Sequence, residues 1–414
     1  MPNWGIDEMY SPNKESLLLK ALNLVKSIDW EYNRILANAE LIEALNRNDM
    51  RNYIAELLED SYKSLEEISN PTSRTIAMIK LGKALYKIGK VNEAFDILRK
   101  AIFSLSAIPD DFEKSRAIEH LIKTLLEMKD NTETIEELLT QLIDVARGIT
   151  DSYVRSEILG DIALVFANFG MIKTAKKLLK KISSKSVKMR TEIELAKILV
   201  LKGKTKDGIK SVNKLDDRHK PDGLVALIDA FSQLGKLNKA YEYFEKLDKF
   251  RNSEYYKALA LIKILSNSPS DDNIDQIYTQ IISYVKSVED PRKQAELLVN
   301  LADIVISKGI VKDEIITQLI AELRNVSKNL VGTDLEDVKT RIAELLVYTG
   351  KMKTGIELAE DIDYSNLHDE ALAEISILLG KKGLIDDALK IIDSLDNEYL
   401  KAVSIISLTK ENNR

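Results

Sequence analysis

The chain has 414 residues, a formal net charge of −6 and no cysteine, which excludes disulfides, thiolate metal sites and cysteine nucleophiles. Its 45% hydrophobic residues suffice for a buried core, while 7 prolines and 16 glycines are too few for a loop-rich β fold. The missing cysteine and the many isoleucine, lysine and glutamate residues fit an intracellular protein from a thermophile.

Signals for membrane insertion and export are not found. No apolar run reaches the roughly 18 residues that a membrane-spanning helix needs. The first residues, Met1–Glu8, lack the basic region and apolar core of a secretory signal. We therefore expect a soluble, cytoplasmic protein with no membrane partner.

Charge is distributed unevenly along the chain. Residues 171–220 hold 16 Lys and Arg against 5 Asp and Glu, a net charge of +11, so the remainder carries −17. Residues 357–398 hold 12 acidic side chains against 3 basic ones. This pattern predicts a basic middle with acidic flanks.

Glycines mark helix ends at regular intervals, and most are followed five residues later by Ala or Gly. With Asn48, Lys129 and Ser268 filling the gaps, the turns recur every 32–33 or 40–41 residues. The turn glycines are Gly89, Gly170, Gly203, Gly235, Gly309, Gly350 and Gly383, and the small residues after them are Ala94, Ala175, Gly208, Ala240, Gly355 and Ala388.

A second marker has the same phase. An apolar residue, a polar turn and often an arginine close each unit, as in Ile28…Arg34 and Ile149…Arg155. Between markers, apolar residues recur every three or four positions, the pattern of amphipathic helices, and strand signals are absent. Ser11-Pro12, Ser268-Pro269 and Asp290-Pro291 are typical of helix starts.

In chain order, these markers predict an N-terminal tail, a capping helix, a continuous solenoid and a C-terminal helix. Short units should hold helices of about 14–16 and 10–12 residues, and long units a second helix about two turns longer. Apolar Val403, Ile405, Ile406 and Leu408 suggest that the last helix covers the final unit or meets a second subunit. The predicted segments are the tail 1–11, capping helix 12–28, solenoid 29–396 (long units 29–150, short units 151–250, long units 251–350, short units 351–396) and C-terminal helix and tail 397–414, with long second helices at 51–68, 132–149, 272–288 and 313–330.

These hairpins resemble tetratricopeptide (TPR) repeats over roughly residues 30–410. When Gly170 is aligned with the turn glycine of a TPR, small, aromatic and large apolar residues fall at the family's packing positions. The family's early Trp and closing Pro are largely missing, and the units of about 41 residues exceed the usual length. The matching residues are Ala163, Phe166, Ala175 and Leu179; Leu81, Gly82, Gly89, Ala94 and Leu98; Leu227, Phe231, Gly235, Ala240 and Phe244; and Ile342, Ala343, Gly350 and Gly355.

The resemblance implies an all-α fold, a right-handed α-solenoid of about ten TPR-like helical hairpins. It also implies that first helices line a concave recognition face. The clamp of the family that holds chaperone C-termini uses paired Lys and Asn, which do not recur here. The equivalent positions are mostly Ile79, Lys83, Gly160, Leu164, Ile193, Lys197, Val225 and Asp229, and Asn300 alone matches.

Catalytic and cofactor motifs are not found, so we expect no enzyme, no cofactor and no metal. The histidines, His120, His219 and His368, are far apart and lack the HExxH spacing of a metal helix. Phosphate-binding glycine loops and the G-x-S-x-G motif are absent. An enzyme with an unrecognised carboxylate pair is the weakest alternative.

The first candidate surface is the basic stretch, with further lysines from Lys197 to Lys214. Its lysines suit contact with RNA phosphates. They equally suit a solvated outer face, or contact with the acidic end of a second subunit in a homodimer. The candidate residues are Lys173, Lys176, Lys177, Lys180, Lys181, Lys185, Lys188 and Arg190.

The second candidate is an aromatic cluster between residues 231 and 256. Phe231 and Phe244 occupy core positions of the repeat, whereas Tyr241, Tyr243 and Tyr255 are candidates for an interface, where exposed tyrosine is favoured. Core packing is the favoured interpretation, since aromatic residues at helical spacing usually face inward. The third candidate is the acidic segment 357–398, which suits a basic peptide such as a ribosomal-protein tail or serves only solubility.

The sequence thus favours a non-enzymatic, TPR-like scaffold for protein–protein interaction in the cytoplasm. The alternative is a ribosome- or ribonucleoprotein-associated factor that docks through the basic middle units and the acidic C-terminal units. The partner is expected to be another protein, with RNA and a homodimer left open.

Overall fold

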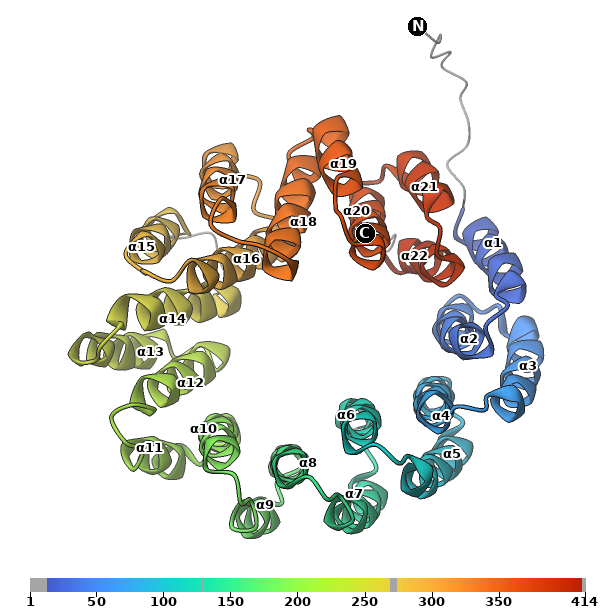
Figure 1. Ribbon diagram of the computed structural model, residues 1–414, viewed down its shortest axis with the longest axis horizontal. Coiled ribbons are helices and arrows are strands. Elements are labelled where there is room, and N and C mark those ends of the chain that lie inside the picture. Colours follow the sequence, from blue (N-terminus) through green and yellow to red (C-terminus); the bar gives the residue numbers. More distant parts are fainter. Residues whose placement is uncertain (1–12, 129, 269–273, 412–414) are drawn as a thin grey trace, which may run out of the picture. The chain divides into compact units, whose positions relative to one another are not determined.

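The computed structural model describes residues 13–128, 130–268 and 274–411 and is all-helical in these ranges, which confirms the predicted all-α solenoid (Figure 1). The predicted tail 1–11, the Ser11-Pro12 start, the turn position Lys129 and Pro269 lie outside the described residues.

Helices follow one another in hairpins joined by short turns. In the N-terminal part they are α1 (Lys14–Ser27), α2 (Glu31–Arg47), η1 (Arg51–Tyr53), α3 (Ile54–Glu67), α4 (Pro71–Lys87), α5 (Val91–Ser104), η2 (Leu105–Ala107), α6 (Asp111–Glu127) and α7 (Thr132–Arg147). In the middle they are α8 (Ser152–Asn168), α9 (Ile172–Leu179), α10 (Lys185–Leu201), α11 (Thr205–Asn213), α12 (Lys220–Gln233), α13 (Leu237–Phe244), η3 (Glu245–Lys249), α14 (Ser253–Asn267) and α15 (Ile274–Lys286). In the C-terminal part they are α16 (Pro291–Ser307), α17 (Asp313–Ser327), α18 (Thr333–Tyr348), α19 (Met352–Glu360), α20 (Ser365–Lys381), α21 (Ile385–Ser394) and α22 (Glu398–Glu411).

The second helices have two lengths. In the predicted long units, α3, α7, α15 and α17 have 13 to 16 residues. In the predicted short units, α9, α11, α13, α19 and α21 have only 8 to 10 residues, less than the sequence suggested. The difference of one to two turns accounts for the two repeat spacings. The proposed segment boundaries themselves stay a prediction.

All seven predicted turn glycines have a left-handed backbone, with φ between 67° and 87°. At Gly170, the amide of Met171 donates to the carbonyl of Phe166 at 2.8 Å, which closes the end of α8. A Cβ at Gly170 would meet no atom within 4 Å, so its backbone angle, and not lack of space, requires glycine there.

Glycine is required at positions 208 and 355 for a different reason, which is lack of space. A Cβ on either residue would lie 2.7 Å from a backbone carbonyl oxygen of the preceding first helix, that of Ala196 or Ala343. The two helices of these hairpins can therefore approach closely only because no side chain intervenes. The small residue five positions after each of these turns therefore permits the close packing of the hairpin.

The arginine of the second marker ties successive hairpins together. Arg34 Nη1 donates to the carbonyl of Ile28 at 2.8 Å, and Arg155 Nη1 donates in the same way to Ile149 at 2.7 Å. The helix start at Pro291 is also confirmed, since Asp290 accepts a hydrogen bond from the amide of Arg292. Recurrent polar contacts thus fix the path of the chain between hairpins.

The chain contacts divide it into two compact units. Unit 1 comprises residues up to Ser69, Lys80–Ala94 and residues from Ile342 on, and unit 2 comprises Asn70–Ile79 and Phe95–Arg341. In unit 2 the first helices α6, α8, α10, α12, α14 and α16 pack in sequence on one another (Figure 1). The second helices α9, α11, α13, α15 and α17 each pack on the helix before them and form the second layer.

Within unit 1, the last helix packs against the first two, so the terminal segments lie side by side (Figure 1). Ile405, Ile406 and Leu408 of α22 are fully buried, which means that the chain itself covers these apolar side chains. Ion pairs rim the contact, with Lys20 Nζ 2.9 Å from Asp393 Oδ1 and Lys410 Nζ 2.8 Å from Glu40 Oε2. The helix that the sequence placed over the final unit therefore also contacts α1 and α2.

Candidate partner-binding surfaces

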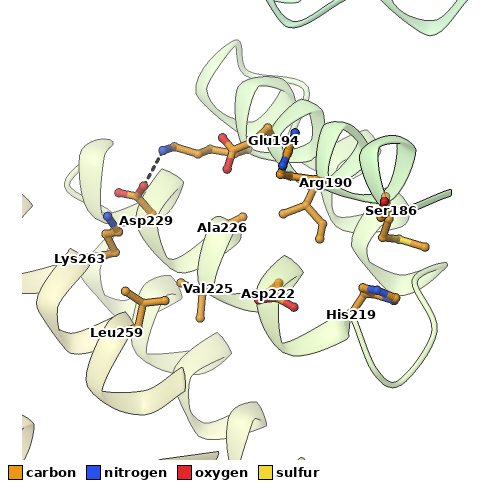
Figure 2. A pocket seen from close by; sticks show the side chains of 13 residues that line it. Ser186, Arg190, Glu194, His219, Asp222, Val225, Ala226, Asp229, Leu259 and Lys263 are labelled. Atoms are coloured by element: carbon orange, nitrogen blue, oxygen red, sulfur yellow. Dashed lines mark ion pairs between the residues drawn. The ribbon is translucent and has the colours of Figure 1, made fainter. Parts of the chain in front are cut away.

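Two hollows open on the first-helix layer of unit 2. The first holds about 390 Å³ and is lined mainly by α10, α12 and α14 (Figure 2). The second holds about 460 Å³ and is lined mainly by α6, α8 and α10. Both include Glu194 and Lys197 of α10, so they adjoin along one face. We call the two hollows together the first-helix groove.

The first hollow has an apolar floor and charged walls. Val225 and Ala226 lie between Arg190 and Glu194 on one side and Asp229 and Lys263 on the other, and Leu259 lies beside Lys263 on α14 (Figure 2). The first hollow thus combines apolar surface with charges of both signs.

Asp229 is the fixed point of this hollow. Its carboxylate is buried, lies 2.6 Å from Lys197 Nζ, and accepts hydrogen bonds from Gln233 at 2.9 Å and Asn267 at 3.1 Å. Three partners from three helices hold the carboxylate in one orientation, so Lys197 is positioned over the groove rather than free to swing.

The second hollow carries unbalanced negative charge. Asp161 lies in it with Glu119 and Lys123, beside the apolar Leu126 and Leu164. Burial first, and then the charges of Glu119 and Glu157, raise the pKa of Asp161 from 3.8 to about 6. A neighbouring cation would lower this pKa again, which makes the hollow receptive to a basic group.

Five of the eight positions equivalent to the chaperone clamp line the groove, although the Lys and Asn pattern of that clamp is missing. Repeat alignment could therefore have located the groove, and its charged residues were missed because they do not repeat from hairpin to hairpin. The five are Leu164, Ile193, Lys197, Val225 and Asp229.

Two of the three histidines contact an aspartate close to them in the sequence. His219 Nδ1 lies 2.6 Å from Asp216 Oδ1, three residues before it, and His368 Nδ1 lies 3.2 Å from the adjacent Asp369. Within the described ranges, no group of three His, Asp or Glu side chains could hold a metal ion.

The predicted basic residues separate into two places. Lys173, Lys176 and Lys177 on α9, and Lys180 and Lys181 directly after it, are exposed on the second-helix layer. Lysines on and around α11 continue this exposure, and we call these ten residues the basic surface. Its α11 members are Lys202, Lys204, Lys206, Lys210 and Lys214.

The other three predicted basic residues belong to α10. Lys185 is exposed and Lys188 half-buried near the start of that helix, and Arg190 lines the first hollow and pairs with Glu157. The structure therefore does not bring all eight sequence candidates together, because α9 and α10 belong to different layers.

The three candidate tyrosines have different surroundings. Tyr243 is buried and stacks on Phe231 with ring centroids 5.5 Å apart, so it serves the core. Tyr241 is exposed at the edge of the same cluster. Tyr255 is half-buried, and its hydroxyl lies 3.3 Å from the Glu296 carboxylate. These tyrosines do not form one exposed patch.

The acidic segment 357–398 also has internal partners. Asp369 is buried and accepts hydrogen bonds from the amides of Asp396 at 3.2 Å and Asn397 at 2.9 Å. Asp393 pairs with Lys20, and Asp387 lies 3.0 Å from Lys390. Part of this charge is therefore used to hold helix ends and neighbouring helices.

Comparison with known protein families identifies one helical repeat, in the region of the first hollow. Residues 225–252, which include most of the α12–α13 hairpin, match the model of the PPR repeat, a helical repeat family related to TPR. A search of curated proteins gives no significant match. No helix in the described ranges is long and apolar enough to cross a membrane.

Two solved structures are similar to this chain. One is the crystal structure of Ton1535 from Thermococcus onnurineus NA1, with 17% identity, a TM-score of 0.29, and coverage of 90% of this chain and 98% of that chain. The other is a circular tandem repeat protein with novel repeat topology and enhanced subunit contact surfaces, with 13% identity, a TM-score of 0.26, and coverage of 94% and 98%. Helical repeat folds of this kind are typical of scaffolds that bind protein or RNA.

Proposed function

We propose that this chain is a non-enzymatic, cytoplasmic scaffold that binds a segment of a partner protein in the first-helix groove. The observation that carries the proposal is the pair of adjoining hollows, which share Glu194 and Lys197 and extend over five first helices. An extended or helical segment that follows the layer would contact both hollows.

The composition of the groove favours a peptide over a nucleic acid. Half-buried leucines alternate with carboxylates and cations, whereas a phosphate backbone requires predominantly positive charge. The negative bias around Asp161 favours a basic side chain in the second hollow. Lys263 favours an acidic one in the first, since the charge of Lys197 is already matched by Asp229.

A displayed library of random peptides tests this function even though the partner is unidentified. We expect selection on the intact chain to converge on a motif with apolar residues between a basic and an acidic position. Leu164→Glu in the second hollow and Leu259→Glu in the first should each weaken the selected peptide at least about tenfold, since each buries a charge in the contact.

Val311→Glu is the matched control, because Val311 belongs to unit 2, is 73% exposed and lies outside both hollows. It should leave the affinity unchanged. Failure to select any convergent motif, or equal binding by the two groove variants and the unmodified chain, would contradict the proposal.

A second candidate function, association with ribosomes or other ribonucleoprotein, is favoured by the basic surface alone. In this role the acidic C-terminal units would contact basic protein. Binding that weakens steeply with salt would support it, whereas groove binding of a partly apolar peptide should depend on salt only weakly.

A further inference from the structure

The basic surface gathers ten exposed lysines with few acidic residues among them. Elsewhere, cations bridge successive hairpins: Lys26 to Glu56 at 2.7 Å, Lys286 to Glu322 at 2.8 Å, and Arg99 to Glu137 at 3.2 Å. In the described part of the chain, none of the ten lysines of the basic surface forms an ion pair. Helix α9 contains no acidic residue, and α11 contains only Asp207.

The lysines lie in two rows on one layer. Lys173, Lys176, Lys177 and Lys180 recur at spacings of three and four, so they share one face over roughly 10 Å of helix. Lys206, Lys210 and Lys214 recur every four residues on α11 in the same way. Both helices pack on α10, so a rod-shaped polyanion across the layer can touch both rows.

The residue types that are missing from α9 and α11 restrict the class of ligand that the basic surface can bind. Neither α9 nor α11 contains an aromatic residue, so bases of a single strand would find no stacking platform. Protein interfaces usually depend on buried aromatic or arginine anchors, and these helices have none. Point charges on flexible stems suit phosphates whose positions are set by a duplex.

We propose that the basic surface binds the phosphate backbone of a double-stranded nucleic acid without regard to base sequence. Lysine contacts with phosphates do not depend on the sugar, so an RNA duplex serves as the probe. This surface lies on the second-helix layer, apart from the groove on the first-helix layer. The inference is therefore independent of the proposed peptide binding and supplies a ligand for the second candidate function.

Fluorescence anisotropy with a labelled RNA duplex of about 20 base pairs, at roughly 50 to 200 mM salt, tests the proposal. The test variant replaces four lysines by glutamine: Lys176→Gln, Lys177→Gln, Lys206→Gln and Lys210→Gln. The control variant makes the same change of charge at exposed lysines that belong to neither row: Lys100→Gln, Lys249→Gln, Lys328→Gln and Lys351→Gln.

We expect the test variant to lose at least about tenfold in affinity at 100 mM salt and the control to lose less than about twofold. The slope of log K against log salt should fall by about 3.6 in the test variant, since four phosphate contacts are lost and each contributes about 0.9 for B-DNA. Circular dichroism should show both variants fully helical. The groove variant Leu259→Glu should bind the duplex normally, which separates this inference from the proposed peptide binding.

Four results would overturn the inference. The duplex does not bind at 50 mM salt; both quadruple variants lose affinity equally; a single strand of the same length binds more tightly; or a DNA duplex of the same length does not bind at all. Light scattering tests whether a second copy of the chain occupies the basic surface instead. Self-association of the intact chain that the test variant abolishes would assign the surface to the acidic region of a second copy instead.

Discussion

The terminal helices of unit 1 and the second helices α9 and α11 of unit 2 are both rich in lysine, but their lysines have different surroundings. Lys20 and Lys410 pair with Asp393 and Glu40 beside a fully buried apolar contact. The lysines of α9 and α11 face solvent without partners in the described chain. Charge matched within the chain thus supports packing, whereas unmatched charge opposes folding slightly through self-repulsion.

The largest effect should come from breaking the apolar contact of the terminal helices. Ile405→Asp places a charge where the side chain is fully buried in α22, and we expect a loss of about 4 kcal/mol in the free energy of unfolding. Urea denaturation followed by circular dichroism measures it. Lys177→Asp in the other region should change stability by less than about 0.5 kcal/mol. A loss below about 1 kcal/mol for Ile405→Asp would mean that the contact is absent in solution.

Glycine substitutions compare how tightly the two regions are packed. A Cβ at Gly380 in α20 would collide with the Leu408 side chain of α22, whose tip can move. A Cβ at Gly208 in α11 would lie 2.7 Å from the carbonyl oxygen of Ala196, which cannot move without its helix. We therefore expect Gly208→Ala to cost about 2 kcal/mol and Gly380→Ala less than about 1, after the gain in helix propensity. Thermal unfolding of both variants in parallel would show a reversed order if this reasoning is wrong.

A negative charge with acidic neighbours occurs at Asp161 on α8. Its effect on the free energy of unfolding should depend on pH. The pKa of Asp161 is raised to about 6, so the folded chain holds a proton there that the unfolded chain has released. Stability from this group is full below about pH 4 and is lost as pH rises from about 4 to about 6. Asp161→Asn should remove that loss, worth about 1 kcal/mol at pH 7 for a partly exposed group. Urea denaturation at pH 4, 5, 6 and 7 measures the free energy of unfolding of the unmodified chain and of Asp161→Asn. If the difference between the two proteins does not change with pH, the prediction is wrong.

The smallest effects should come from single lysines. Lys20→Ala removes a pair whose side chains are 39% and 60% exposed, so we expect a loss of about 0.2 to 1 kcal/mol. Lys176→Ala removes no pair and should be neutral or slightly stabilising, since it relieves repulsion among neighbouring lysines. A double-mutant cycle of Lys20→Ala with Asp393→Ala isolates the pair, and coupling indistinguishable from zero would count against a structural role.

Local features of the fold could be predicted from the sequence, and long-range ones could not. The turn at Gly170 and the close approach at Gly208 each leave a mark within a few residues, because backbone angle and helix packing restrict residue type locally. The contact of α22 with α1 and α2 leaves no such mark, since any apolar helix face could cover Ile405 equally well.

The candidate surfaces followed the same rule. The exposed lysines of α9 were predicted from their number and spacing, and the structure shows that Arg190 belongs to the groove instead. The sequence leaves Tyr243 open between an interface and the core, and in the structure it stacks on Phe231 in the core. The groove forms where particular first helices lie next to one another, which the sequence does not specify. The placement of Asp161 and Asp229 in it could therefore not be predicted.

The packing of α22 on α1 has a consequence for biosynthesis. Most hairpins can acquire their neighbours as the nascent chain leaves the ribosome, because each contacts segments made just before or after it. The face of α1 that α22 covers must wait until residues 398–411 have been translated, several hundred residues after α1 itself. A product that stops before α22 would therefore display an uncovered apolar face on α1, a feature by which quality-control factors can recognise such products.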